Sequence, residues 1–195
     1  MIRKLALIAF AFSLLASGAA KSTTWEADPA HSSITFKVRH MMISKVPGSF
    51  DKFTIALNLD DEDVTKSSVN VAIEAASINT GVEKRDNHLR SPDFFDVAKF
   101  PQITFVSKRI EKSEGGMKLI GDLTMHGVTK EVALTVDGPT APMTDPMGSV
   151  RMGASATTKI SRADFGLVWN KVLEAGQAVV GDDVEISVEV ELIKK

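Results

Sequence analysis

The chain of 195 residues contains no cysteine. A chain without cysteine cannot be a disulfide-stapled scaffold, and it lacks the thiol that anchors a bacterial lipoprotein. Basic residues are not in excess either, since 23 Lys and Arg stand against 25 Asp and Glu. Nucleic-acid binding needs a basic face, so no nucleic-acid partner is expected. With 44% hydrophobic residues, the chain is expected to fold around its own core.

Only one long apolar run is present, and it lies at the start of the chain. Arg3 and Lys4 precede the run Leu5–Leu15, and small residues follow in Ala16–Ala20. The run is shorter than the roughly 20 residues that a bilayer span needs. Basic, apolar and small residues in this order are typical of a secretory signal peptide. We predict a cleaved signal peptide over residues 1–20, a mature domain over residues 21–195 and a location in the bacterial periplasm.

Alternating hydrophobicity dominates the rest of the sequence. Apolar side chains recur at every second position in several segments, which are residues 31–41, 53–59, 69–73, 117–125, 132–136 and 184–192. A period of two predicts half-buried strands, and the turn signals between them predict an antiparallel arrangement. Gly115–Gly116 and His126–Gly127 are expected turns, and Pro47–Gly48 is expected to form a turn or a bulge. We predict an all-β fold of about eight strands with one or two short helices in the loops.

A sheet of this kind must form a sandwich or close on itself, and closure removes the unpaired edges. An eight-stranded barrel is just wide enough to be filled by side chains or to hold one small ligand. The segment from Arg85 to Ser107 bears on that choice, because Phe94, Phe95 and Phe100 lie within seven positions of one another there. A loop with so much apolar mass is expected to plug or line the container that the strands form.

Candidates for chemistry are few. His31, His40, His88 and His126 have no metal-site spacing, so structural hydrogen bonds are favoured over a zinc site built from distant positions. Arg85, Asp86 and His88 could perform acid–base chemistry or form a charge-paired turn; no nucleophile with its base is recognisable nearby. The acidic run 60–63 lacks the glycine and final glutamate of a calcium loop. We expect no metal, no cofactor and no catalytic residue.

Five blocks of sequence, in order, are similar to the YceI-like proteins. They are HSSITFKVRH with SKVPGSF (residues 31–50), RDNHL with DFFD (85–96), PQITFVS (101–107), GDLTMHGVTK (121–130), and RADFG with GDDVEI (162–166 and 181–186). Each block alone is a weak signal, but the series covers nearly the whole mature chain. Residues 139–148 match no pattern that can be carried over.

This resemblance implies an elongated, lipocalin-like antiparallel barrel. It also implies a periplasmic protein that holds a long isoprenoid lipid, such as a quinone or a prenyl phosphate, and no established enzyme activity. The strand alternation then selects the inward residues as candidate ligand contacts: Phe36, Val38, Phe53, Ile55, Phe105, Leu123, Ile186 and Val188. The non-strand aromatic residues are expected at the plug or mouth: Phe94, Phe95, Phe165 and Trp169. His40 shares the inward face of its strand and is expected near a polar head group.

Two alternatives remain open at this level. One is a filled barrel that interacts with a membrane redox protein. The other is an enzyme acting on a small amphiphile through Arg85, Asp86 and His88. Transient contact with an inner-membrane protein fits both the lipid-binding protein and the filled barrel. A monomer and a homodimer are both compatible with the sequence.

Overall fold

The structure is a computed structural model that describes residues 22–171 and 178–195. The predicted signal peptide lies outside the described residues. The twelve strands, bounded as follows, belong to one sheet: β1 (Ser22–Ala27), β2 (Ser33–His40), β3 (Ser44–Phe50), β4 (Phe53–Asp60), β5 (Ser68–Glu74), β6 (Ile78–Asn79), β7 (Gln102–Ser113), β8 (Gly116–Met125), β9 (Val128–Asp137), β10 (Met143–Thr144), β11 (Val150–Ser161) and β12 (Val180–Lys194).

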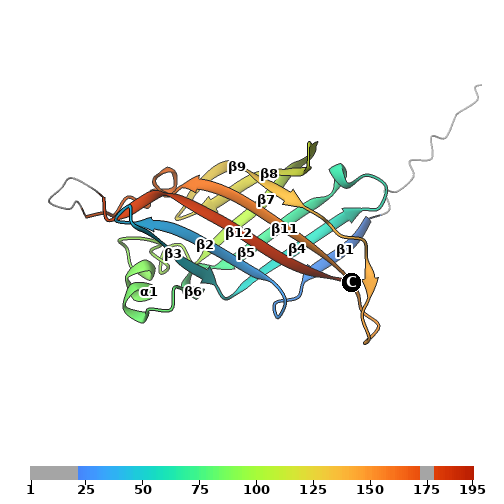
Figure 1. Cartoon of the computed structure of the whole chain (residues 1–195), viewed down its shortest axis with the longest axis horizontal. Coiled ribbons are helices and arrows are strands. Elements are labelled where there is room, and N and C mark those ends of the chain that lie inside the picture. Colours follow the sequence, from blue (N-terminus) through green and yellow to red (C-terminus); the bar gives the residue numbers. More distant parts are fainter. Residues whose placement is uncertain (1–21, 172–177) are drawn as a thin grey trace, which may run out of the picture.

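Eight of these strands close a ring of antiparallel pairs, in the order β11-β9-β8-β7-β5-β4-β1-β12 and back to β11. The seam is β12, which pairs with β11 along its length, with β1 near Lys194 and with β2 between Val180 and Glu189. The short strands β3 and β6 extend the sheet beyond β2. The closed, elongated barrel of about eight strands is therefore confirmed (Figure 1).

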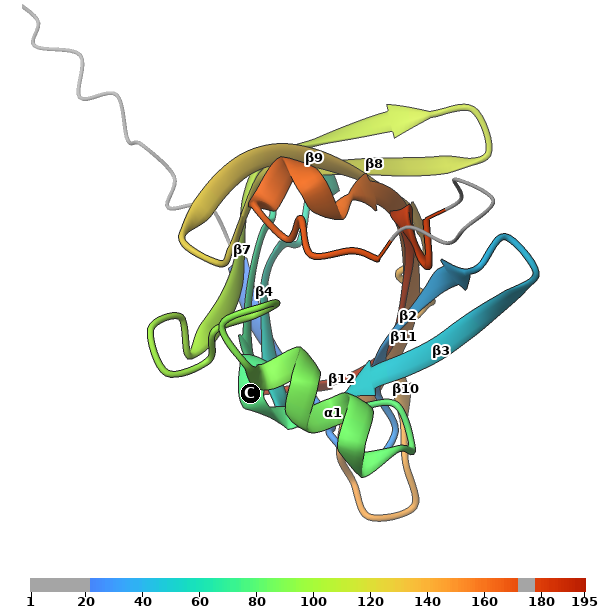
Figure 2. The same cartoon turned by 90° about the vertical axis from the view of Figure 1, so that its left-hand side faces the viewer.

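Helical structure is confined to the connections. A single α-helix, α1 (Glu83–Arg90), follows β6, and three 3-10 turns are η1 (Val64–Lys66), η2 (Ala75–Ser77) and η3 (Arg162–Phe165) in the described chain. Figure 2 shows α1 lying across the edge of the ring. The helix is almost wholly polar, so apolar packing alone does not hold it. The Arg90 guanidinium fixes it by donating to the carbonyl oxygens of Ala76 (2.7 Å) and Ile78 (2.8 Å).

The end of the barrel that carries α1 is called the α1 end below. It includes the β2–β3 turn, the His126–Gly127 turn and η3, whereas η1 and β10 lie at the opposite end (Figure 1). A large apolar cluster that includes Ile78, Met125 and Phe165 packs toward the α1 end. A smaller cluster of Trp25, Leu57, Met152 and Leu192 packs toward the opposite end.

The structure departs from the sequence pattern in two places, a turn signal and a strand register. Pro47–Gly48 is not a turn, because both residues pair with β2 inside β3 and the turn lies at Met41–Ile43 instead. A bulge between Ser107 and Arg109 shifts the register of β7 against β8. The inward face of β7 therefore changes from odd-numbered to even-numbered positions along the strand.

Candidate functional site

The barrel encloses a cavity of about 530 Å³. Pockets for small ligands range from about 300 to 1,000 Å³. The cavity wall is overwhelmingly apolar and takes residues from β2, β4, β5, β7, β8, β9, β11 and β12. Side chains such as Val38, Ile186 and Val188 face inward yet are only half-buried. They border empty space instead of packed neighbours, so the barrel is hollow and the filled-barrel alternative does not describe it.

The cavity runs along the barrel. Its lining includes Arg39, His88 and Trp169 at the α1 end and Leu59 and Val64 at the opposite end. The side chain of His88 lines the cavity and is 39% exposed, so the cavity reaches the molecular surface at the α1 end. Such a long, apolar space suits an extended apolar molecule, because every buried methylene group contributes about 0.8 kcal/mol.

Most of the predicted contact residues line this cavity. They are Phe36, Val38, His40, Ile55, Phe94, Phe95, Phe105, Leu123, Trp169, Ile186 and Val188. Two do not. Phe165 is fully buried within the apolar cluster at the α1 end, and Phe53 packs against the same cluster at the start of β4. Both point toward the protein interior but meet packed side chains there, a distinction that alternation cannot make.

Aromatic side chains border the cavity at the α1 end. The His88 ring lies edge-on to Phe94 (centroids 5.0 Å apart) and to Trp169 (4.8 Å apart). Its Nε2 lies 2.9 Å from Oδ2 of Asp93. The imidazole of His88 thus joins α1 and the loop after it to the segment after η3, which is distant in sequence. The phenylalanine-rich stretch lines the container, as its composition predicts.

The polar residues of α1 do not form one catalytic cluster. The buried Asp86 carboxylate accepts hydrogen bonds from the backbone and the hydroxyl of Thr80, whereas His88 pairs with Asp93. Arg85 donates to the hydroxyl oxygen (2.7 Å) and the carbonyl oxygen (3.0 Å) of Thr80. Arg85 and His88 line the cavity and Asp86 does not. The geometry is that of a charge-paired turn beside the cavity.

Arg162 organises the segment that carries Trp169, a role that the sequence reading missed. Its side chain is buried and donates to the carbonyl oxygens of Leu167, Trp169 (2.9 Å) and Gly181 (2.9 Å). It also reaches the Asp182 carboxylate at 3.1 Å. A buried guanidinium with this many acceptors fixes the segment 167–169 beside the cavity.

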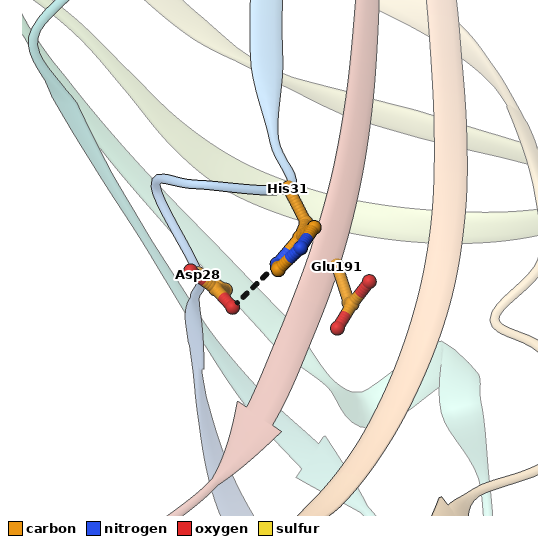
Figure 3. Close-up of side chains that lie close together, drawn as sticks. All are labelled: Asp28, His31 and Glu191. Atoms are coloured by element: carbon orange, nitrogen blue, oxygen red, sulfur yellow. Dashed lines mark hydrogen bonds and ion pairs between the residues drawn. The ribbon is translucent and has the colours of Figure 1, made fainter. Parts of the chain in front are cut away.

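One group of possible metal ligands occurs among the described residues, formed by Asp28, His31 and Glu191 (Figure 3). The guanidinium of Arg151 already neutralises it, since Nη1 lies 2.7 Å from Asp28 and 2.6 Å from Glu191. Arg151 Nε also donates to Asp145 at 2.6 Å. The hydrogen bond from Arg151 holds the pKa of Asp28 well below its usual range, and the hydrogen bond to Asp28 raises the pKa of His31. This ion-pair network ties the β1–β2 and β10–β11 connections to β12 through Arg151.

The other histidines are also accounted for. His126 Nδ1 lies 3.2 Å from the carbonyl oxygen of Phe165, and its ring packs edge-on against Phe100. His40 lines the cavity at the end of β2. No helix in residues 22–171 or 178–195 has the length and apolar character that a membrane crossing requires.

A closed antiparallel barrel around an elongated apolar cavity is the architecture of lipocalin-like proteins. The chain belongs to the YceI-like domain family, whose model matches residues 25–192. A UPF0312 protein of Staphylococcus aureus strain MSSA476 is 39% identical over 169 residues, which cover 87% of this chain and 96% of that protein.

Solved structures share the fold. The YCEI protein of Campylobacter jejuni is 32% identical, with a TM-score of 0.68 over 82% of this chain and 91% of that one. A polyisoprenoid binding domain from Saccharophagus degradans, implicated in plant cell wall breakdown, superposes with a TM-score of 0.61. The two share 17% sequence identity, over 89% of this chain and 99% of that domain, so this likeness concerns the fold alone.

Proposed function

We propose that this protein is a periplasmic binding or carrier protein that holds one long isoprenoid lipid inside its barrel. The observation that carries the proposal is the apolar cavity that runs along the barrel and reaches the surface at the α1 end. An isoprenoid chain is poorly soluble in water and gains about 0.8 kcal/mol for each methylene that it buries. The polyisoprenoid binding domain that shares this fold supports the same class of cargo. The signal-like residues 1–20 support the periplasmic location.

The arginine and histidine residues of the lining lie toward the α1 end, where we place the head group of the lipid. Arg85, His40 and Thr80 border the cavity there, and Arg85 uses only two of its nitrogen atoms in bonding Thr80. A remaining guanidinium N–H can donate to a quinone oxygen or to a phosphate. Arg85→Met should weaken the binding of a prenyl phosphate more than the binding of a quinone, because the phosphate carries the greater negative charge.

The direct test is native mass spectrometry of the protein purified from periplasm, followed by organic extraction of the bound molecule. A co-purifying mass that matches a polyprenyl compound supports the proposal and names the cargo. An apo mass that stays unchanged after incubation with isoprenoid quinones and prenyl phosphates contradicts it, and interaction with a membrane redox protein then becomes the leading function.

A matched pair of variants locates the cargo. Ala156 on β11 lines the cavity, and the adjacent Thr157 faces solvent. Ala156→Phe places an aromatic ring inside the cavity and should reduce the bound lipid, whereas Thr157→Phe should leave it unchanged. Equal lipid occupancy in both variants would place the cargo outside the barrel.

A further inference from the structure

Besides Val82 at the start of α1, three large apolar side chains are exposed at the α1 end. Met42 and Ile43, in the β2–β3 turn, are 62% and 76% exposed, and Val168, after η3, is 69% exposed. Single exposed apolar residues are ordinary on protein surfaces. These three are connected through the backbone, because Met41 N–H donates to the carbonyl of Val179 and Val179 N–H donates to the carbonyl of Lys171. We call Met42, Ile43 and Val168 the apolar rim.

The apolar rim is continuous with the cavity. Val168 stands between Leu167 and Trp169, and both of these line the cavity. On the other side, Met41 follows His40 and bonds to Val179, and both of those residues also line it. An apolar molecule leaving the cavity at this end therefore passes directly beside exposed apolar side chains. Figure 2 looks onto this end of the barrel.

Positive charge lies immediately behind the β2–β3 turn. Lys37, Arg39 and Lys45 are exposed on the outer faces of β2 and β3. They surround one carboxylate, Glu185, which lies 2.6 Å from Lys45 Nζ and feels the charges of all three cations. Three cations against one anion leave a local positive surface on a chain whose overall charge is −2. An apolar turn backed by cations matches a bilayer with anionic head groups.

We propose that the α1 end docks on the surface of a bilayer that contains anionic phospholipid, with the apolar rim inserted among the head groups. Cargo then passes between bilayer and cavity without crossing water. The inference rests on the proposed function for the identity of the cargo, but docking itself is measured without cargo. The alternative occupant, a membrane protein, is an outcome of the test.

The first experiment is flotation of the mature protein with vesicles of phosphatidylcholine and phosphatidylglycerol in equal parts. The wild type should bind these vesicles more strongly than pure phosphatidylcholine, and added salt should weaken the preference. Replacing the whole rim (Met42→Ser, Ile43→Ser, Val168→Ser) should lower the partition coefficient about tenfold, since large apolar side chains lose their inserted area. Met147→Ser is the matched control, because Met147 is 90% exposed in the loop between β10 and β11.

A second pair of variants tests the charge. Lys37→Gln with Arg39→Gln should abolish the preference for anionic vesicles. Lys112→Gln with Lys118→Gln removes the same charge beside the β7–β8 turn, at the opposite end from the rim, and should preserve it. Wild-type protein that binds neither kind of vesicle would overturn the proposal and leave a membrane protein as the candidate partner. Equal loss in the two charge variants would also overturn it, since it would indicate nonspecific attraction.

Transfer separates this proposal from the proposed function. A short-chain isoprenoid quinone, soluble enough to be titrated in water, should bind the rim variant as tightly as the wild type. Transfer of a long-chain isoprenoid quinone out of vesicles should be slower for the rim variant only. Vesicle binding without any quinone binding would contradict the cargo and leave docking intact. Quinone binding with equal transfer rates in both proteins would contradict docking and leave the cargo intact.

Discussion

The ring of Phe36 packs directly on Gly48, its partner across the β2–β3 pair, in the space where a side chain would stand. A Cβ atom on Gly48 would overlap three atoms of the ring. Glycine weakens a strand by itself, and an aromatic ring over it restores the lost packing. The same device recurs where Phe105 covers Gly121. Both rings also line the cavity, so these glycines help to set its shape.

We predict that Gly48→Ala lowers the free energy of unfolding by about 1–3 kcal/mol, because the added methyl group forces Phe36 from its position. Gly153→Ala is the control, since the nearest atoms to a Cβ there lie 3.8 and 4.0 Å away. That variant should stay within about 1 kcal/mol of the wild type. Urea unfolding measures both, and equal destabilisation would show that strand flexibility matters and ring contact does not.

Arg162→Lys should be one of the most destabilising conservative substitutions in the chain. A lysine cannot reproduce the planar fork that bonds Leu167, Trp169 and Gly181, and each buried carbonyl left unpaired costs about 1–3 kcal/mol. Lys159→Met, near the end of the preceding strand β11, breaks the exposed pair with Asp183 and should cost less than about 1 kcal/mol. Thermal unfolding compares the two, and similar melting temperatures would contradict the structural role of Arg162.

The Arg151 network should give stability a defined pH dependence. Asp28 and Asp145 have lowered pKa values, so their contribution is present above pH 3.8 and is lost as the pH falls through the folded values. His31 has a raised pKa, so its contribution is present below pH 6.5 and is lost as the pH rises through the folded value. The network therefore contributes most between these limits.

Urea unfolding across this pH range provides the measurement. Asp28→Asn should flatten both slopes, because Asp28 bonds His31 and Arg151 together. Asp61→Asn, in the loop after β4, is the control and should keep the wild-type profile. An unchanged profile in Asp28→Asn would assign the pH dependence to other groups.

The two tryptophans should respond differently to cargo. Trp169 borders the cavity beside His88, whereas Trp25 is buried at the opposite end, where its indole N–H has no partner among the described atoms. A quinone entering the cavity should quench Trp169, so Trp25→Phe keeps the fluorescence response and Trp169→Phe loses most of it. A response that follows Trp25 instead would place the head group at the opposite end.

Sequence alternation predicts the fold and much of the cavity wall because side-chain direction in a strand is a local property. Phe36 and Val38 therefore line the cavity as expected. Whether an inward residue meets space or a neighbour depends on distant elements, so alternation does not separate Phe53, which packs against the core cluster, from Phe36. Phe165, expected at the plug or mouth, lies within that cluster. Pro47–Gly48 resembles a turn, but the Phe36 ring over Gly48 compensates for glycine inside β3. The network of Arg162 depends on carbonyl oxygens, which sequence does not display.

The position of β12 in the ring has a consequence for how the chain folds. The last strand, β12, closes the ring by pairing with the first, where Ala27 lies opposite Leu192. It also binds β2, since Thr35 Oγ1 donates to the carbonyl of Ser187, 152 positions away. Until β12 is available, the other strands can form only an open, curved sheet whose apolar face meets water. Closure of so large a chain loop is slow, so folding should pass through a stage that is prone to aggregation. The yield of functional protein would then depend on a chaperone that protects the open sheet until β12 has paired.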